Sequence, residues 1–230
     1  MMTAEQRQMV EAAVAAAEAR TRGEIYCVAA AASSDYREVV LAWAAGVALL
    51  APALLLLGGV EVSAPDVLDG WTAAQAGGLA ESAVRAALVG AILLQGVLFG
   101  LTAIVVSIPP VRRLLTPAGL KRHRVRERAT EQFRSRNLHA TRERTGVLIY
   151  VSLEERLAEI VADEGIASRV EPAVWAQAMA ALTDGLRRGD PGSGFAEAVG
   201  LCGDVLAAHF PPRDDNPDEL PNALVELPRS

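Results

Sequence analysis

The sequence predicts an α/β protein whose soluble part is interrupted by two membrane-spanning helices. The first observation is a pair of long segments, residues 39–60 and 86–108, that are apolar and contain no charged residue. The second is that segments with helix and strand patterns lie both before and after this pair. The chain is 51% hydrophobic, and the excess over an ordinary soluble domain is concentrated in the two apolar segments.

Each apolar segment is long enough to cross a membrane, since a helix needs about 20 residues to span a hydrocarbon core of about 30 Å. Pro52 in the first segment is tolerable if neighbouring groups satisfy the freed carbonyl. Gln95 in the second can form hydrogen bonds to the first helix or to a second copy of the chain, so a homo-oligomer is one expected partner. Gly90, Gly96 and Gly100 either allow close helix approach or only reflect composition.

The charges that flank the spans predict their orientation. The intervening residues 61–85 carry four carboxylates against a single arginine, whereas residues 111–144 carry eleven Lys and Arg against three Glu. Basic flanks stay in the cytoplasm. The first 38 residues lack the pattern of a signal peptide. We therefore expect a two-pass protein of the inner (plasma) membrane, with the loop 61–85 outside and both termini cytoplasmic.

The first soluble part, residues 1–38, is expected to form one helix and one strand. The helix covers residues 3–20 and begins with a capping box of Thr3 and Gln6. The apolar run at residues 24–31 predicts a strand. A single strand cannot form a sheet, so this one must pair with strands that follow the two spans.

The second soluble part, residues 141–210, is expected to complete the domain. The continuous apolar run at 146–151 predicts a buried strand, and residues 156–163 pair back as a hairpin. A helix opens at Pro172 and ends at Gly189, and a last helix is capped by Ser193. The proline-rich and acidic residues 211–230 predict a disordered tail.

Residues 109–140 are expected to form a basic helix beside the membrane, with Thr116 and Pro117 at its start. Its arginines either attract anionic membrane lipids, at about 1 kcal/mol each near the surface, or only fix the topology. Nucleic acid is not an expected partner, because no aromatic residues accompany the charge. The expected lipid-facing basic residues are Arg112, Arg113, Lys121, Arg122, Arg124, Arg126 and Arg128.

Motifs for nucleophilic or phosphate chemistry are incomplete in the sequence. Residues 189–194 begin like a phosphate-binding loop, but the Lys and Ser/Thr that should follow are absent. The three histidines are far apart, and we expect Cys27 and Cys202 to be buried thiols.

Only acidic residues remain as candidates for chemistry. Asp163 and Glu164 follow a predicted strand, and Asp190 follows a predicted helix. Carboxylates that converge at loops can hold Ca²⁺ or Mg²⁺, so these three residues are the candidate metal ligands. The other interpretation is solvated surface charge. No further cofactor and no catalytic residue is indicated.

Residues 145–166, TGVLIYVSLEERLAEIVADEGI, resemble the core hairpin of the TPM domain family. The LRRGD at residues 186–190, followed by Gly194 and Phe195, resembles the family's FRxGDYxxGL segment, and residues 21–39 resemble its first strand. The family includes thylakoid proteins linked to photosystem II repair and bacterial membrane proteins. The resemblance implies an α/β/α sandwich with a small mixed sheet, here split by an inserted transmembrane helical hairpin.

The resemblance also implies functions, because some members of the family are described as acid phosphatases and some bind divalent cations. Many members carry Asp-Asn-Gly before the central strand, where this sequence has Arg144, Thr145 and Gly146. An arginine in place of the aspartate removes an oxygen ligand and adds a positive charge. Pro191 replaces the family's aromatic residue. Both departures weigh against metal binding and phosphatase activity.

Two functions follow from these observations. The first is that of a module that interacts with other membrane proteins or helps to assemble and stabilise them. A chain with this function is not an enzyme. The alternative is a weak phosphatase that uses a divalent metal held by Asp163, Glu164 and Asp190. Transport is not expected, because the two spans contain no charged residue that would mark a pathway.

Overall fold

The computed structural model of the chain divides into two compact units. One unit combines residues 1–35 and 118–230, and the other contains residues 36–117. The residues that the structure describes are 2–58, 73–138, 144–170, 172–213 and 222–229.

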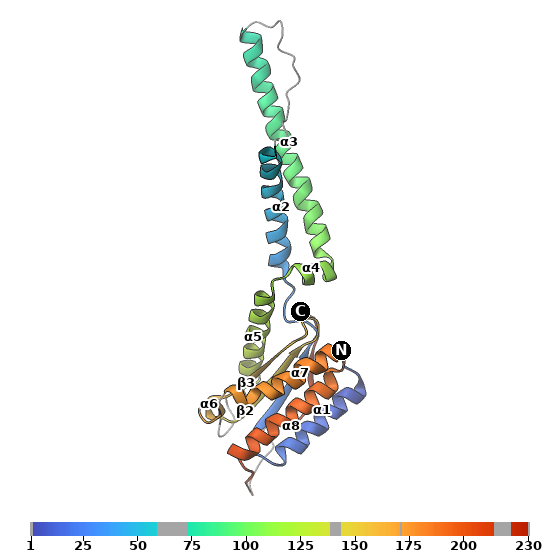
Figure 1. Cartoon of the computed structure of the whole chain (residues 1–230), viewed down its shortest axis with the longest axis vertical. Helices are drawn as coiled ribbons and strands as arrows, with labels where there is room; N and C mark the ends of the chain where they lie inside the picture. Colours follow the sequence, from blue (N-terminus) through green and yellow to red (C-terminus); the bar gives the residue numbers. More distant parts are fainter. Residues whose placement is uncertain (1, 59–72, 139–143, 171, 214–221, 230) are drawn as a thin grey trace. The chain divides into compact units, whose positions relative to one another are not determined.

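The first unit is built around a four-stranded mixed sheet with the order β3-β2-β1-β4, of which Figure 1 labels β2 and β3. Its strands are β1 (Glu24–Ala30), β2 (Gly146–Ser152), β3 (Leu157–Ala162) and β4 (Val225–Leu227). β1 pairs in parallel with β2 and β4, and β2 pairs with β3 as an antiparallel hairpin. The strand before the spans therefore becomes an inner strand of the sheet, as the sequence required.

Helices cover both faces of the sheet and confirm the α/β/α sandwich. Alternating residues of β1 enter different cores: Ile25 and Cys27 pack in one cluster, and Tyr26 and Val28 pack in the other. The first cluster lies under α1 (Ala4–Glu18), α7 (Ala176–Arg188) and α8 (Pro191–His209), and the second lies under α5 (Ala118–Ser135). This two-sided burial explains why the central strands are continuous apolar runs.

Both cysteines are buried, as the sequence predicted. Cys27 lies in β1 and Cys202 in α8, in the same core cluster, and both are free thiols. Burial raises the pKa of the Cys202 thiol to about 12 and raises that of Cys27. Because the thiolate is the reactive form, both side chains are inert in the folded unit.

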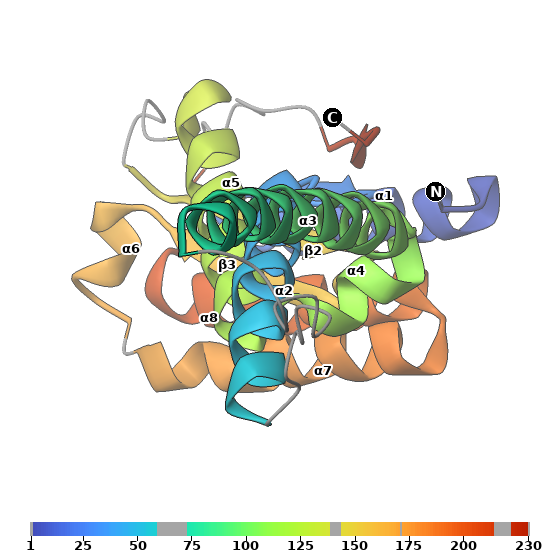
Figure 2. The ribbon, with the colours of Figure 1, turned by 90° about the horizontal axis from the view of Figure 1, so that it is seen from above.

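The second unit contains α2 (Arg37–Leu57) and α3 (Ala73–Ser107), which contact each other, and the short α4 (Pro109–Leu115). Figure 2 shows the three helices from above. Both long helices contain segments, Arg37–Leu55 and Leu88–Ser107, that are long and apolar enough to cross a membrane. Only 17% and 6% of these two segments are buried, which distinguishes them from the core helices of a soluble protein.

Contact between α2 and α3 does not depend on the glycines noted in the sequence. Ala44 and Ala48, one turn apart on α2, are buried. In contrast, a Cβ added at Gly90, Gly96 or Gly100 of α3 would meet no atom within 4 Å. The small residues that allow close approach within this unit are therefore the alanines of α2.

Two expectations for the membrane-flanking segments need correction. α3 begins at Ala73, inside the segment expected to be an outward loop, because alanine, glutamine and leucine favour continued helix. Residues 61–72 of that segment lie outside the described part. The basic segment forms two helices, because Pro109 and Pro110 open α4, at positions where the missing N–H costs nothing, before Thr116 interrupts the helix.

Three expectations for the second soluble part are also corrected. Asp190, rather than Ser193, caps α8, because Pro191 can occupy the first helical position. Pro172 opens a short 3₁₀ helix, η2 (Pro172–Trp175), and a one-turn helix α6 (Glu164–Ala167) precedes it. In the predicted tail, Val225 and Leu227 pack against the α5-side core and β4 pairs with β1. Residues 214–221 lie outside the described residues.

Candidate functional site

The three acidic residues predicted as metal ligands have separate structural roles. Asp163 caps α6 and accepts the Glu164 N–H at 2.7 Å, while its buried Oδ2 has no partner among the described residues. Glu164 is exposed and forms a 2.8 Å ion pair with Arg144. Asp190 caps α8, where its carboxylate accepts hydrogen bonds from the Ser193 hydroxyl at 2.5 Å and from the Gln6 amide at 3.2 Å.

The fold places these residues at opposite ends of the sheet. Asp163 donates its N–H to the carbonyl of Gly146, the first residue of β2. Asp190 contacts the first turn of α1, and Met2 beside that turn bonds Glu226, which pairs with Ala29 near the end of β1. Strands of this length span roughly 20 Å, so Asp190 is not brought together with Asp163 and Glu164.

The residues of the described part do not fit a divalent metal at this place. They contain no group of three or more His, Cys, Asp and Glu side chains that could hold a metal ion. At the position where the family resemblance implies a carboxylate, the guanidinium of Arg144 lies 2.8 Å from Glu164. A guanidinium next to the exposed carboxylate of Glu164 repels a second cation, which disfavours a divalent metal at this place.

Several of the predicted lipid-facing basic residues lie close to glutamates of the first unit. On α5, Arg124 pairs with Glu127 at 3.0 Å and Arg128 pairs with Glu131 at 2.6 Å. Arg126 turns the other way, and its guanidinium lies 3.8 Å from Glu159 of β3. Lys121 and Arg122 lie in the first turns of the same helix, and Arg112 and Arg113 lie in the last turn of α4.

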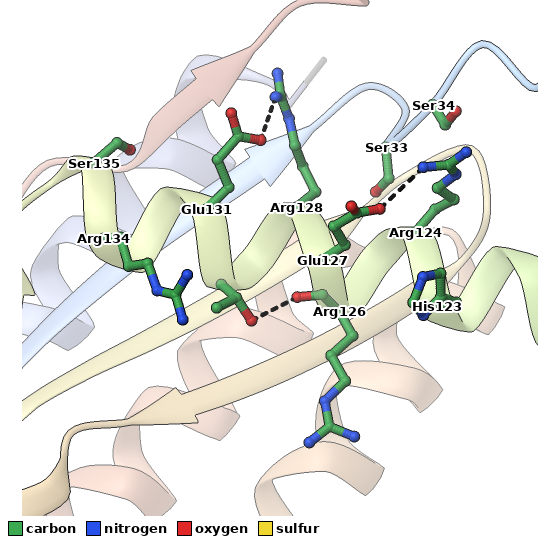
Figure 3. Close-up of a pocket in the computed structure, with 11 residues that line it drawn as sticks. Ser33, Ser34, His123, Arg124, Arg126, Glu127, Arg128, Glu131, Arg134 and Ser135 are labelled. Carbon is green, nitrogen blue, oxygen red and sulfur yellow. Dashed lines mark hydrogen bonds and ion pairs between the residues drawn. The ribbon is translucent and has the colours of Figure 1, made fainter.

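The helix α5 forms one side of a polar groove with a volume of 980 Å³ (Figure 3). Ser33 and Ser34, which follow β1, form its other side. We call this the α5 groove. Its α5 residues are mostly charged: His123, Arg124, Arg126, Glu127, Arg128, Thr130, Glu131, Arg134 and Ser135.

A network of buried and partly buried polar groups adjoins the α5 groove. The Ser33 hydroxyl lies 3.0 Å from the hydroxyl of Tyr150, and the Ser33 N–H donates to the Glu155 carboxylate at 3.3 Å. Ser152 also hydrogen-bonds Glu155. Burial raises the pKa of the Tyr150 phenol, which the Ser33 hydrogen bond partly opposes, so the hydroxyl stays neutral and positions Ser33.

This network lies at the carboxyl ends of β1 and β2, the edge where α/β sheets commonly bind ligands. The sequence reading missed Ser33, Tyr150, Ser152 and Glu155. The available signal was a serine at or shortly after the end of two buried strands, since Ser152 ends β2 and Ser33 lies three residues after β1. The groove presents guanidinium, hydroxyl and carboxylate groups in alternation, which suits recognition of a charged polar surface.

The fold and groove together define a class of protein, an α/β/α domain that carries two helices apolar enough to cross a membrane. The model of the TPM domain family matches residues 103–205. This match confirms the family resemblance read from the sequence. It runs from within α3 to within α8, and the structure shows that α1 and β1 complete the same compact unit from outside the matched residues.

Among solved structures, the chain is similar to the BA42 protein of the psychrophilic bacterium Bizionia argentinensis, determined by NMR. The sequences are 19% identical, the TM-score is 0.55, and the alignment covers 98% of this chain and 95% of that one. At this identity the similarity shows the fold alone. A comparison with curated proteins found no match.

Proposed function

We propose that the chain is a two-pass protein of the inner membrane whose cytoplasmic TPM-like domain binds and stabilises other membrane proteins. The observation that carries the proposal is the pairing of β1 with β2 along all seven residues of each strand. These strands lie on opposite sides of the two apolar helices in the sequence, so their pairing requires that both helix ends reach the same side of the membrane. Basic flanks then favour the cytoplasmic side.

The α5 groove supports an interaction role. Its paired Arg and Glu side chains are exposed enough to exchange partners, and arginine is enriched where proteins bind one another. Its polar floor holds Ser33 in one orientation, which makes the surface preorganised. Arg112, Arg113, Lys121 and Arg122 would contact anionic lipid headgroups beside the same domain. The metal-dependent phosphatase alternative gains no support, because Asp190 is not brought together with Asp163 and Glu164.

The orientation can be tested with single cysteines, since the two native thiols are buried. Ser63→Cys introduces a thiol between the spans, and Ala208→Cys introduces an exposed thiol on α8. A membrane-impermeant maleimide should label Ser63→Cys in intact cells and Ala208→Cys only after lysis. The reverse pattern would contradict the proposed topology.

The interaction role can be tested by photo-crosslinking in native membranes. A benzophenone amino acid replaces Ser135, which lines the α5 groove, or Glu197, an exposed residue of α8. The Ser135 position should give a discrete protein adduct that the Glu197 position does not give. Adducts with lipid alone, or identical protein adducts from both positions, would refute the interaction module.

A further inference from the structure

The edge strand β3 leaves a row of main-chain groups unpaired. β3 is the outermost strand next to β2, and Asp163 at its end donates its N–H to Gly146 of β2. Since N–H and C=O groups alternate in direction along an antiparallel strand, those of Ala158, Ile160 and Ala162 point away from β2. The described residues supply no main-chain hydrogen bond to these three outside the sheet.

A groove with a volume of 370 Å³ follows this edge, a volume within the usual range of roughly 300–1,000 Å³ for ligand sites. Arg126 and Thr130 of α5 line one side of it, and residues near α6 and η2, including Val170 and Trp175, line the other. The edge therefore lies between α5 and the residues near α6 and η2. A single extended segment can enter between them, whereas a second copy of β3 is flanked by the same elements, which obstruct pairing of two copies.

The two edges of the sheet differ in how they are protected. β4 is only three residues long and is followed by Pro228, and short strands and proline discourage further pairing. β3 is six residues long, LAEIVA, and contains no proline or lysine. Glu159 is its only charge, so β3 is the edge that remains available.

Glu159 gives this edge a charge preference. Its side chain is only 32% exposed, and the Arg126 guanidinium at 3.8 Å is beyond hydrogen-bond distance. Burial raises the pKa of the Glu159 carboxyl, and Arg126 opposes the rise. A cationic side chain placed directly opposite on the same face would stabilise the carboxylate further.

From this geometry we propose that β3 binds an extended segment of a protein partner as an additional strand, with Lys or Arg opposite Glu159. Because side chains alternate between faces, the neighbours of that cation turn toward Val170 and Trp175 and are small or apolar. The inference rests on the proposed interaction function and adds to the α5 groove a second contact surface, together with the chemistry of the partner segment that binds there.

Hydrogen exchange at single-residue resolution tests the proposal on the full chain in nanodiscs. The probe is a capped hexapeptide of alternating Lys and Val. At about ten times the measured Kd, the amides of Ala158, Ile160 and Ala162 should exchange roughly tenfold more slowly. Those of Glu159 and Val161, already bonded to β2, should not change. Protection at β4, or none at β3, overturns the proposal.

Charge variants make the test specific. Glu159→Lys should transfer the preference from the Lys-Val peptide to a matched Glu-Val peptide, and Glu197→Lys on α8 should leave it unchanged. Equal binding of both peptides by the unmodified chain overturns the proposal. So does β3 protection that appears with rising protein concentration and no peptide, since it would mean self-pairing.

The same experiments separate this inference from the function on which it rests. If the Ser135 photo-crosslink captures a membrane protein while the β3 amides remain unprotected by peptide, strand addition is refuted and the interaction module stands. If the crosslink captures no protein, the interaction module is refuted, whatever the peptide does.

Discussion

The α2–α3 pair and the α/β unit use the same apolar residue types in opposite ways. Ile149 in β2 is fully buried between two layers of helices, whereas Leu50 of α2 and Leu93 of α3 are 63% and 64% exposed. The strands of the unit alternate between two cores, while the segments Arg37–Leu55 and Leu88–Ser107 of the two long helices are apolar and little buried. The pattern of apolar residues, more than their number, thus indicates which solvent each region requires.

The largest expected effect tests this difference directly. Ile149→Ala should lower the free energy of unfolding of the α/β unit by about 2–5 kcal/mol, because it removes buried methyl groups and leaves a cavity. Leu50→Ala, a comparable truncation in α2, should leave that unit unchanged. Urea-dependent proteolysis of the full chain in nanodiscs measures both, and similar losses would mean that the regions are not distinct.

A smaller effect is expected from glycines at helix contacts. A Cβ at Gly185 of α7 would lie 2.6 Å from Cα of Gly194 in α8, which is a backbone atom and cannot rotate out of the way. Gly185→Ala should therefore cost about 1–3 kcal/mol of unfolding free energy by overpacking. Gly100→Ala in α3, where nothing lies within 4 Å, should be neutral in the same proteolysis assay. A neutral Gly185→Ala would show that α7 and α8 can separate without cost.

The smallest effect concerns the cap of α8. Hydrogen bonds from the Ser193 hydroxyl and N–H, assisted by Gln6 and Arg188, lower the pKa of the Asp190 carboxyl. A lowered pKa in the folded state means that the charge stabilises the fold above the ordinary aspartate pKa of about 3.9, and that this is lost as the pH falls through the lowered value.

Asp190→Asn should therefore lower the Tm of the α/β unit by about 2–5 °C at pH 7. The difference from the unmodified chain should shrink as the pH falls below about 4. Thermal scans from pH 7 to pH 2.5 measure this Tm difference, with Asp184→Asn, at an exposed position of α7, as the control. A Tm difference that persists unchanged in acid would contradict a role for the ionised cap.

Much of the fold could be predicted because strong local patterns determine it. The strands β1, β2 and β3 are apolar runs bounded by turn residues, and the capping box of Thr3 and Gln6 is present in α1. β4 could not be predicted, because its three residues lie among prolines and acids and form a strand only by pairing with β1. The start of α8 was misplaced because both Asp190 and Ser193 are good caps.

Less of the candidate site than of the fold could be predicted from the sequence. The arginines of α5 were evident, but Ser33 and Tyr150 join them only because β1 and β2 end side by side. The metal prediction grouped acidic residues by their positions after secondary-structure elements, and the fold separates them. The exposed edge of β3 depends on strand order, which a hairpin pattern alone does not determine.

The interrupted sheet also has a consequence for biogenesis. β1 is made early, yet its neighbours β2 and β4 emerge only after both apolar helices have been synthesised. Until then the amino-terminal segment has no strand with which to form this sheet, and such long-range pairing is slow. Under the proposed two-pass topology, folding of the domain therefore reports that both ends of the helical hairpin lie on one side of the membrane. Under the same topology, a wrongly inserted hairpin would leave β1 exposed, and quality-control proteases could then distinguish that chain from a finished protein.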